Sequence, residues 1–240
     1  MSKVFFIILG VVVVVALYNT WKIVRAFSIA RPLVQTAVAF NLEDPSLEKT
    51  VLVVGDSTAV GVGGKGELSV PGRLSQWLNA SIENYGKSGA RTRDITEQLS
   101  RAKLARYDLL LIQIGANDVI YFSSIGRTQQ ELLEVLHLAK KKSDKVLLLT
   151  AGDIGDAPVF SFPINEIFSA RTRALRKHFS ETAARLGIVY VDIYAKPSPF
   201  GSDPTRYYAP DGLHLSGDGY GYWFSIVQKY VQENWPNIVR

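Results

Sequence analysis

The 240-residue sequence contains no cysteine. This absence excludes a disulfide framework, a thiolate nucleophile and any metal site built on cysteine. Histidine is also scarce, with three copies, and the acidic residues near one of them are scattered along the chain. A metal site needs a closer group of such ligands, so we expect neither a metal nor another cofactor.

The sequence also lacks a basic stripe interleaved with aromatic side chains, although its formal net charge is +5. Because the positive residues are dispersed, we expect no nucleic-acid binding. No internal repeat or low-complexity tract occurs apart from one valine run. With 47% hydrophobic and 20% charged residues, the chain is long enough for one full-sized globular domain and an appendage.

Charged and strongly polar residues are missing from residues 4–18, an apolar run that ends near Trp21. The run predicts an N-terminal transmembrane helix, so that residues 1–21 anchor the protein in the cell membrane. A cleaved signal peptide is the alternative, because Ser28-Ile29-Ala30 has small residues at suitable positions. Basic residues flank the run on both sides and leave its orientation open; we expect the following domain to lie on the exported side.

Residues 22–49 mix basic, apolar and proline-containing stretches and predict a juxtamembrane linker, partly helical, before a domain over residues 50–240. In this domain, apolar runs alternate with segments of helical periodicity. The predicted strands are 51–54, 81–85, 108–114, 145–150 and 188–193, and the predicted helices are 71–79, 92–105, 127–142, 164–186 and 217–233. The alternation predicts an α/β domain with a flavodoxin-like fold, in which a five-stranded, mostly parallel sheet has the order 2-1-3-4-5 and helices cover both faces.

Polar residues follow two strands that this order places at a topological switch point, where ligands bind beyond the carboxyl ends of the strands. Ser57 comes three residues after the first strand and needs a base to become a nucleophile. His214 lies in a loop that should reach the same edge of the sheet, and Asp211 precedes it by three residues. One tight loop can therefore orient the imidazole as a general base, although a turn with a helix-capping histidine is the plain alternative.

The other two histidines fit this role less well. His137 lies inside a leucine-rich helical pattern, and His178 is surrounded in sequence by basic residues that oppose its protonation. We expect both to be ordinary helix residues.

Acyl transfer also needs hydrogen-bond donors for the oxyanion that develops on the substrate. The backbone amide of Ser57, the side-chain amide of Asn117 and the backbone amide of Gly89 are candidates, because each lies in a turn after a predicted strand. Glycine and asparagine are also common in turns that bind nothing. The coincidence of a nucleophile, a base, its acid and three donors at one edge favours a functional site.

Four short blocks occur in one order: Gly55-Asp56-Ser57, Gly89, Gly115-Ala116-Asn117-Asp118 and Asp211-Gly212-Leu213-His214. Together they resemble the motif blocks of the SGNH, or GDSL-type, esterase and lipase family over roughly residues 50–235. The resemblance implies a three-layer α/β/α hydrolase with Ser57 as nucleophile, His214 as base and Asp211 as its partner. It also implies an oxyanion hole formed by Ser57, Gly89 and Asn117. Thr58 stands where the family often has leucine, which affects the expected substrate shape and not the mechanism.

Two other functions remain as alternatives. Residues 59–66 approach a phosphate-binding loop, but Gly66 stands where a magnesium-binding serine or threonine is required. We interpret this glycine run as a flexible loop that borders the substrate site. A membrane-anchored binding module with the same fold and no catalysis is the second alternative.

We therefore predict a membrane-anchored serine hydrolase that cleaves carboxylic esters through an acyl-enzyme intermediate. Its partners are a small-molecule, lipid or glycan ester and the membrane; the sequence does not indicate an oligomeric state. The segment 152–164 follows the fourth strand and carries Val159, Phe160 and Phe162. These side chains either line an acyl or glycan pocket or pack over the sheet.

Overall fold

The computed structural model describes residues 3–196 and 198–238. Within these residues, five strands form one sheet in the order β2-β1-β3-β4-β5, and all four neighbouring pairs are parallel. The strands are β1 (Lys49–Gly55), β2 (Ala80–Asn84), β3 (Leu109–Gln113), β4 (Val146–Thr150) and β5 (Val189–Asp192). The predicted fold class and strand order are confirmed.

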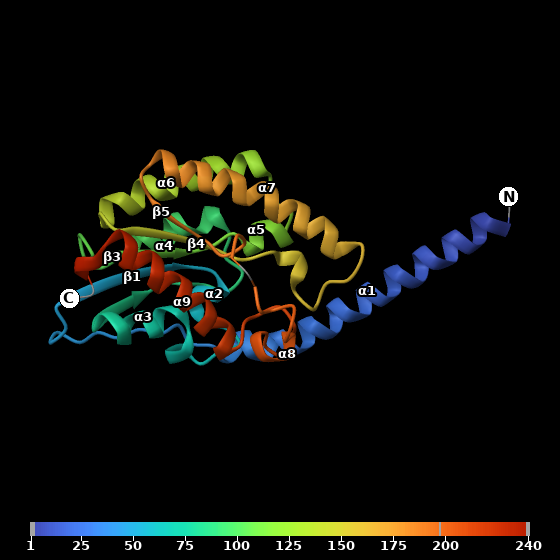
Figure 1. Ribbon diagram of the computed structural model, residues 1–240, viewed down its shortest axis with the longest axis horizontal. Coiled ribbons are helices and arrows are strands. Elements are labelled where there is room, and N and C mark those ends of the chain that lie inside the picture. Colours follow the sequence, from blue (N-terminus) through green and yellow to red (C-terminus); the bar gives the residue numbers. More distant parts are fainter. Residues whose placement is uncertain (1–2, 197, 239–240) are drawn as a thin grey trace.

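Helices cover both faces of the sheet (Figure 1). The α-helices are α1 (Lys3–Thr36), α2 (Ser57–Val60), α3 (Val70–Leu78), α4 (Ile95–Ser100), α5 (Ala116–Ile120), α6 (Ile125–Lys142), α7 (Ile164–Arg185), α8 (Pro204–Tyr207) and α9 (Gly217–Asn234). Short 3₁₀ turns are η1 (Gly66–Leu68), η2 (Thr92–Asp94), η3 (Ile154–Asp156) and η4 (Pro236–Ile238).

Two hydrophobic cores lie on opposite faces of the sheet because successive strand residues point to opposite sides. Val51 and Val53 of β1 pack with α3 and α9, whereas Leu52 and Val54 pack with α4, α6 and α7. Both faces of the central strands are therefore buried, which explains why these strands are continuous apolar runs.

Local capping fixes where several helices begin. The Ser69 side chain accepts a hydrogen bond from the Gly72 amide at the start of α3, and Pro71 occupies its first turn. Ser216 caps α9 in the same way, by accepting from the Gly219 amide. These caps set the direction in which each helix leaves the sheet edge.

The predicted helix over residues 92–105 is shorter in the structure. It consists of η2 and α4, which ends at Ser100. Beyond this point, the Lys103 amide donates to the carboxylate of Glu83 and the Leu104 amide donates to the hydroxyl of Tyr107. These side chains take up backbone donors that a longer helix would use, so the helix stops.

Helix α1 is one continuous element of 34 residues and does not break at residue 21, the predicted end of the anchor. It is long and apolar enough to cross a membrane. Figure 1 shows its N-terminal half extending away from the domain, while its C-terminal half lies against it. Residues 37–48 then follow the outer edge of the sheet, where Leu42 forms an antiparallel bridge with Ile82 of β2. This segment protects the edge strand.

The two cores predict a clear difference between two leucines. Leu111 is fully buried in the central strand β3, whereas Leu133 is an exposed residue of α6. We expect Leu111→Ala to lower the free energy of unfolding by about 2–5 kcal/mol, because it leaves a cavity between rigid neighbours. Leu133→Ala is the control and should cost less than about 1 kcal/mol. Urea unfolding of the two variants, both kept in one detergent because α1 is apolar, measures the difference. Equal losses in the free energy of unfolding would contradict this assignment of the core.

Candidate active site

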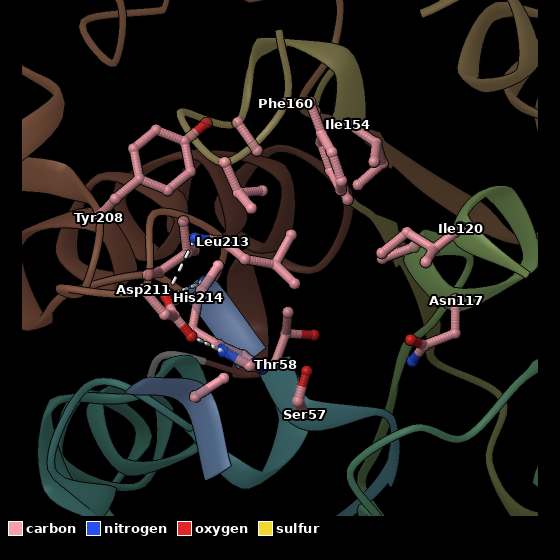
Figure 2. Close-up of a pocket in the computed structure, with 18 of the residues that line it drawn as sticks. Ser57, Thr58, Asn117, Ile120, Ile154, Phe160, Tyr208, Asp211, Leu213 and His214 are labelled. Carbon is pink, nitrogen blue, oxygen red and sulfur yellow. Dashed lines mark hydrogen bonds and ion pairs between the residues drawn. The ribbon is translucent and has the colours of Figure 1, made fainter. Parts of the chain in front are cut away.

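One large cavity lies at the carboxyl edge of the sheet, with a volume of about 1020 Å³. Ser57, Gly89, Asn117, Asp211 and His214 all line it, although they come from four separate turns. Figure 2 shows Ser57 and His214 on one side of the cavity and Asn117 across from them. The structure thus brings every predicted site residue to one place.

Ser57 is the first residue of α2, and only Asp56 separates it from the end of β1. Gly55 makes this tight passage possible, because a Cβ at that position would lie 2.2 Å from the carbonyl oxygen of Gln113 on the neighbouring strand. The side-chain amide of Gln98 holds the same glycine by donating to its carbonyl and accepting from its amide. The strand end is therefore clamped, and the serine hydroxyl projects into the cavity from a fixed backbone.

His214 and Asp211 form a closely coupled pair. Nδ1 of His214 lies 2.5 Å from Oδ2 of Asp211, and the other carboxylate oxygen accepts the backbone amides of Leu213 and His214 at 3.0 Å. Burial raises the pKa of Asp211, but hydrogen bonds from the His214 ring and these amides outweigh it and leave the pKa below its ordinary value. A carboxylate held in this way keeps the proton of the ring on Nδ1 and leaves Nε2 free to act as a base.

The loop that carries the pair, residues 208–216, is pinned on several sides. Tyr208 and Leu215 form an antiparallel bridge, and the Ala209 amide donates to the carbonyl of His214. Gly212 adopts a positive φ of 68°, and its carbonyl accepts the amide of Val159. This last bond joins the histidine loop to the segment after β4.

Three donors face the cavity with capacity to bind an oxyanion. Within the described residues, the backbone amides of Ser57 and Gly89 make no hydrogen bond to another group. The side-chain amide of Asn117 donates one hydrogen to the carbonyl of Ala90 at 3.0 Å, and its second hydrogen is available. Gly89 has a positive φ of 82° with open space around it, so a ligand can approach its backbone closely.

Ser57 and His214 are not hydrogen-bonded to each other in the described part of the chain, although both line the cavity. Catalytic hydrogen bonds are commonly long in ligand-free enzymes and tighten when substrate binds. The absence of this bond from a ligand-free structure is therefore compatible with Ser57 and His214 acting as a pair.

Two further residues hold the donors in place, and sequence reasoning assigned neither a role. The buried carboxylate of Asp118 accepts both the amide and the hydroxyl of Thr92, which ties the turn after Gly89 to α5. Arg171 of α7 donates to the backbone carbonyls of Asp118, Val119 and Ser123 and so fixes the end of α5. Their partners lie far away in sequence, which is why no local pattern indicated them.

The sequence also predicted that two further segments lie near the site: the stretch after β4 and the glycine run 61–66. The segment 152–164 lines the cavity through Ile154, Val159 and Phe160, whereas Phe162 is exposed. The glycine run 61–66 does not border the cavity. Gly63 and Gly64 instead pack against Leu215 and Tyr220 beneath the histidine loop, so this run is a packing element rather than the flexible border that the sequence suggested.

The two remaining histidines lie outside the cavity lining. His137 is exposed on α6 and His178 is half-buried on α7. Among residues 3–196 and 198–238, no group of three or more side chains could hold a metal ion.

Asp56, the residue before Ser57, is a buried acid with a strongly shifted titration. Burial raises its pKa from 3.8 to about 6, although the amide and hydroxyl of Thr58 and the nearby His214 partly oppose the shift. Between about pH 4 and 6 the folded state therefore binds a proton that the unfolded state has lost. The contribution of this residue to stability decreases as the pH rises across that window.

Asp56→Asn should therefore stabilise the protein near neutral pH. The raised pKa corresponds to a gain of up to about 3 kcal/mol at pH 8, because asparagine can still accept from Thr58 and carries no charge to bury. The gain should disappear below about pH 4, where the wild-type carboxyl is protonated in both states. Urea unfolding of both proteins from pH 4 to 8 measures this; a gain that does not change with pH would contradict a buried titrating carboxyl.

Comparison with known proteins gives a consistent result. A family model described as "GDSL-like Lipase/Acylhydrolase family" matches residues 53–222. A GDSL-like esterase of Mycobacterium tuberculosis is 27% identical over 184 residues, which cover 71% of this chain. The chain spans only 57% of the length of that relative.

Two solved structures share the fold. Phospholipase A1 from Streptomyces albidoflavus NA297 superposes with a TM-score of 0.62 at 16% identity, over 76% of this chain and 99% of that one. The lipase/acylhydrolase from Enterococcus faecalis gives a TM-score of 0.59 at 22% identity, over 77% and 96% of the two chains. The family match covers all four motif blocks and most of the sheet, and the chain belongs to the GDSL-like lipase/acylhydrolase family.

Proposed function

We propose that this protein hydrolyses carboxylic esters, with Ser57 as nucleophile, His214 as general base and Asp211 as the residue that orients and stabilises the imidazole. The main support is that the serine hydroxyl, the carboxylate-bound imidazole and the Asn117 amide line one cavity. Membership of a lipase and acylhydrolase family agrees with this chemistry.

In the first half of the reaction, Oγ of Ser57 attacks the ester carbonyl carbon and its proton passes to Nε2 of His214. The carbonyl oxygen becomes negatively charged and accepts hydrogen bonds from the amides of Ser57 and Gly89 and from the side chain of Asn117. The carbon–oxygen bond to the alcohol then breaks, and the alcohol leaves with the proton from His214. An acyl ester on Ser57 remains.

In the second half, water takes the place of the alcohol. His214 removes a proton from water as its oxygen attacks the acyl carbon, and the same donors stabilise the second oxyanion. When this intermediate collapses, the proton returns to Oγ of Ser57 and the acid is released. Asp211 stays ionised throughout and stabilises the positive imidazolium.

A serine-directed fluorophosphonate probe tests the nucleophile. Ser57→Ala should abolish covalent labelling and lower ester hydrolysis by a factor of at least about 10³, because it removes the proposed nucleophile. Ser180→Ala, on the outer side of α7, is the control and should keep both signals. Labelling that persists in Ser57→Ala would refute this assignment, and a wild-type protein without labelling or hydrolysis would support the binding-module alternative.

We further propose that α1 remains attached as a single membrane anchor, with the domain on the exported side. Asn19 donates to the carbonyl of Phe162, Lys22 donates to the carbonyl of Pro158, and Ala30 is buried against the domain. Cleavage near Ser28-Ile29-Ala30 would remove Asn19 and Lys22 and expose this surface, which supports retention over cleavage.

Retention predicts that protein from the membrane fraction has an intact mass that includes the segment before Ala30. It should also resist extraction with alkaline carbonate, because an apolar helix of this length partitions strongly into lipid. A C-terminal alkaline phosphatase fusion, which is active only outside the cytoplasm, reports the side of the domain. A soluble product shortened near Ala30 would support the signal-peptide alternative.

A further inference from the structure

The C-terminal half of α1 carries a stripe of side chains that line the active-site cavity. Ile23, Ala26, Phe27, Ala30 and Val34 recur at intervals of three and four residues, so they share one helix face. All five line the same cavity as Ser57 and His214. The helix that is suited to cross the membrane thus continues as one wall of the site.

Two polar residues of α1 form hydrogen bonds with the segment after β4, which also lines the cavity. Nζ of Lys22 lies 2.7 Å from the carbonyl oxygen of Pro158 and 2.6 Å from Oγ of Ser161. The side chain of Asn19, buried although it follows the long apolar run, donates to the carbonyl of Phe162 at 3.0 Å. The segment after β4 is therefore joined both to α1 and, through Val159 and Gly212, to the histidine loop.

Aromatic and basic residues at the end of the apolar run indicate the level of the membrane surface. Tyr18 and Trp21 are exposed aromatic residues at the end of the apolar run, and Lys22 and Arg25 lie over their rings. Tyrosine, tryptophan and basic residues collect at the boundary between headgroups and acyl chains. Phe162, which is 71% exposed, lies beside Asn19 at this level. With α1 anchored in the membrane as proposed above, these residues place the rim of the cavity at the membrane boundary.

The cavity is large and mostly apolar away from the reacting groups. Its volume of about 1020 Å³ is at the upper end of the range of about 300–1,000 Å³ typical of small-molecule sites. Ile120, Ile154, Phe160 and Leu213 of the domain point into the cavity (Figure 2), which the α1 stripe also lines. A short acyl group would leave most of this apolar surface exposed to water, whereas a long hydrocarbon chain would cover it.

We propose that α1 is a wall of the acyl-binding site and that the substrate is a long-chain acyl ester of a lipid in the membrane that α1 crosses. The acyl chain passes from the bilayer along Ile23, Phe27 and Ala30 and brings the ester to Ser57. This inference rests on the proposed esterase function and adds to it the origin of the substrate and the residues that select it.

Two neighbouring residues of α1 provide a matched test. Phe27 and Val24 are similarly exposed, at 61% and 63%, but only Phe27 belongs to the cavity lining. An aspartate on the acyl wall must lose water when a hydrocarbon chain binds beside it, whereas one at position 24 does not. The full chain in detergent micelles is assayed with p-nitrophenyl palmitate and p-nitrophenyl butyrate, and the ratio of the two kcat/KM values is compared.

We expect Phe27→Asp to lower the palmitate-to-butyrate ratio by about tenfold and Val24→Asp to leave it within about twofold of wild type. Ala26→Trp, which fills the wall without adding charge, should lower the ratio in the same direction. Equal ratios in Phe27→Asp and Val24→Asp, with butyrate hydrolysis present, would overturn the role of α1. A wild-type protein that hydrolyses neither ester would instead overturn the proposed function itself.

Discussion

Parallel pairing of the five strands is the constraint on which the rest of this structure depends. It brings the turns after β1, β2 and β3 and the histidine loop to one edge, although these segments are far apart in sequence. The sheet alone sets only the approximate position of each turn. Finer placement comes from a few buried polar links, in particular Gln98 to Gly55 and Asp118 to Thr92. The site is therefore held by a rigid sheet and by hydrogen bonds between turns.

Hydrogen bonding at this edge favours the charged carboxylate that the proposed chemistry needs. Asp211 is surrounded by donors that hold its pKa below the ordinary value, so it remains an anion beside His214. Asp56 is a second buried acid close to the same ring, and burial raises its pKa to about 6. A buried carboxylate lowers stability, and such costs are common where a protein keeps a group for function rather than for folding.

Much of the fold could be predicted from the sequence because its signals are local. The predicted strand ranges overlap all five observed strands, and caps such as Ser216 follow directly from residue type. The four motif blocks indicated which turns form the candidate site. The contact of α1 with the domain could not be predicted, because the hydrogen bond from Asn19 joins residues 143 positions apart. Composition predicted a membrane segment that ends at residue 21. The spacing of the apolar residues from Ile23 to Val34 indicates a helix face, but not which part of the protein this face contacts.

Ser57 and α1 must serve one substrate if the proposed function and the proposed acyl wall are both correct. A structure of the full chain after reaction with a fluorophosphonate that carries a long alkyl chain tests this in one experiment. We expect phosphorus bonded to Oγ of Ser57, its oxygen directed toward Gly89 and Asn117, and the alkyl chain lying against Phe27 and Ala30. Phosphorus on another residue, or an alkyl chain that leaves the cavity away from α1, would contradict this expectation.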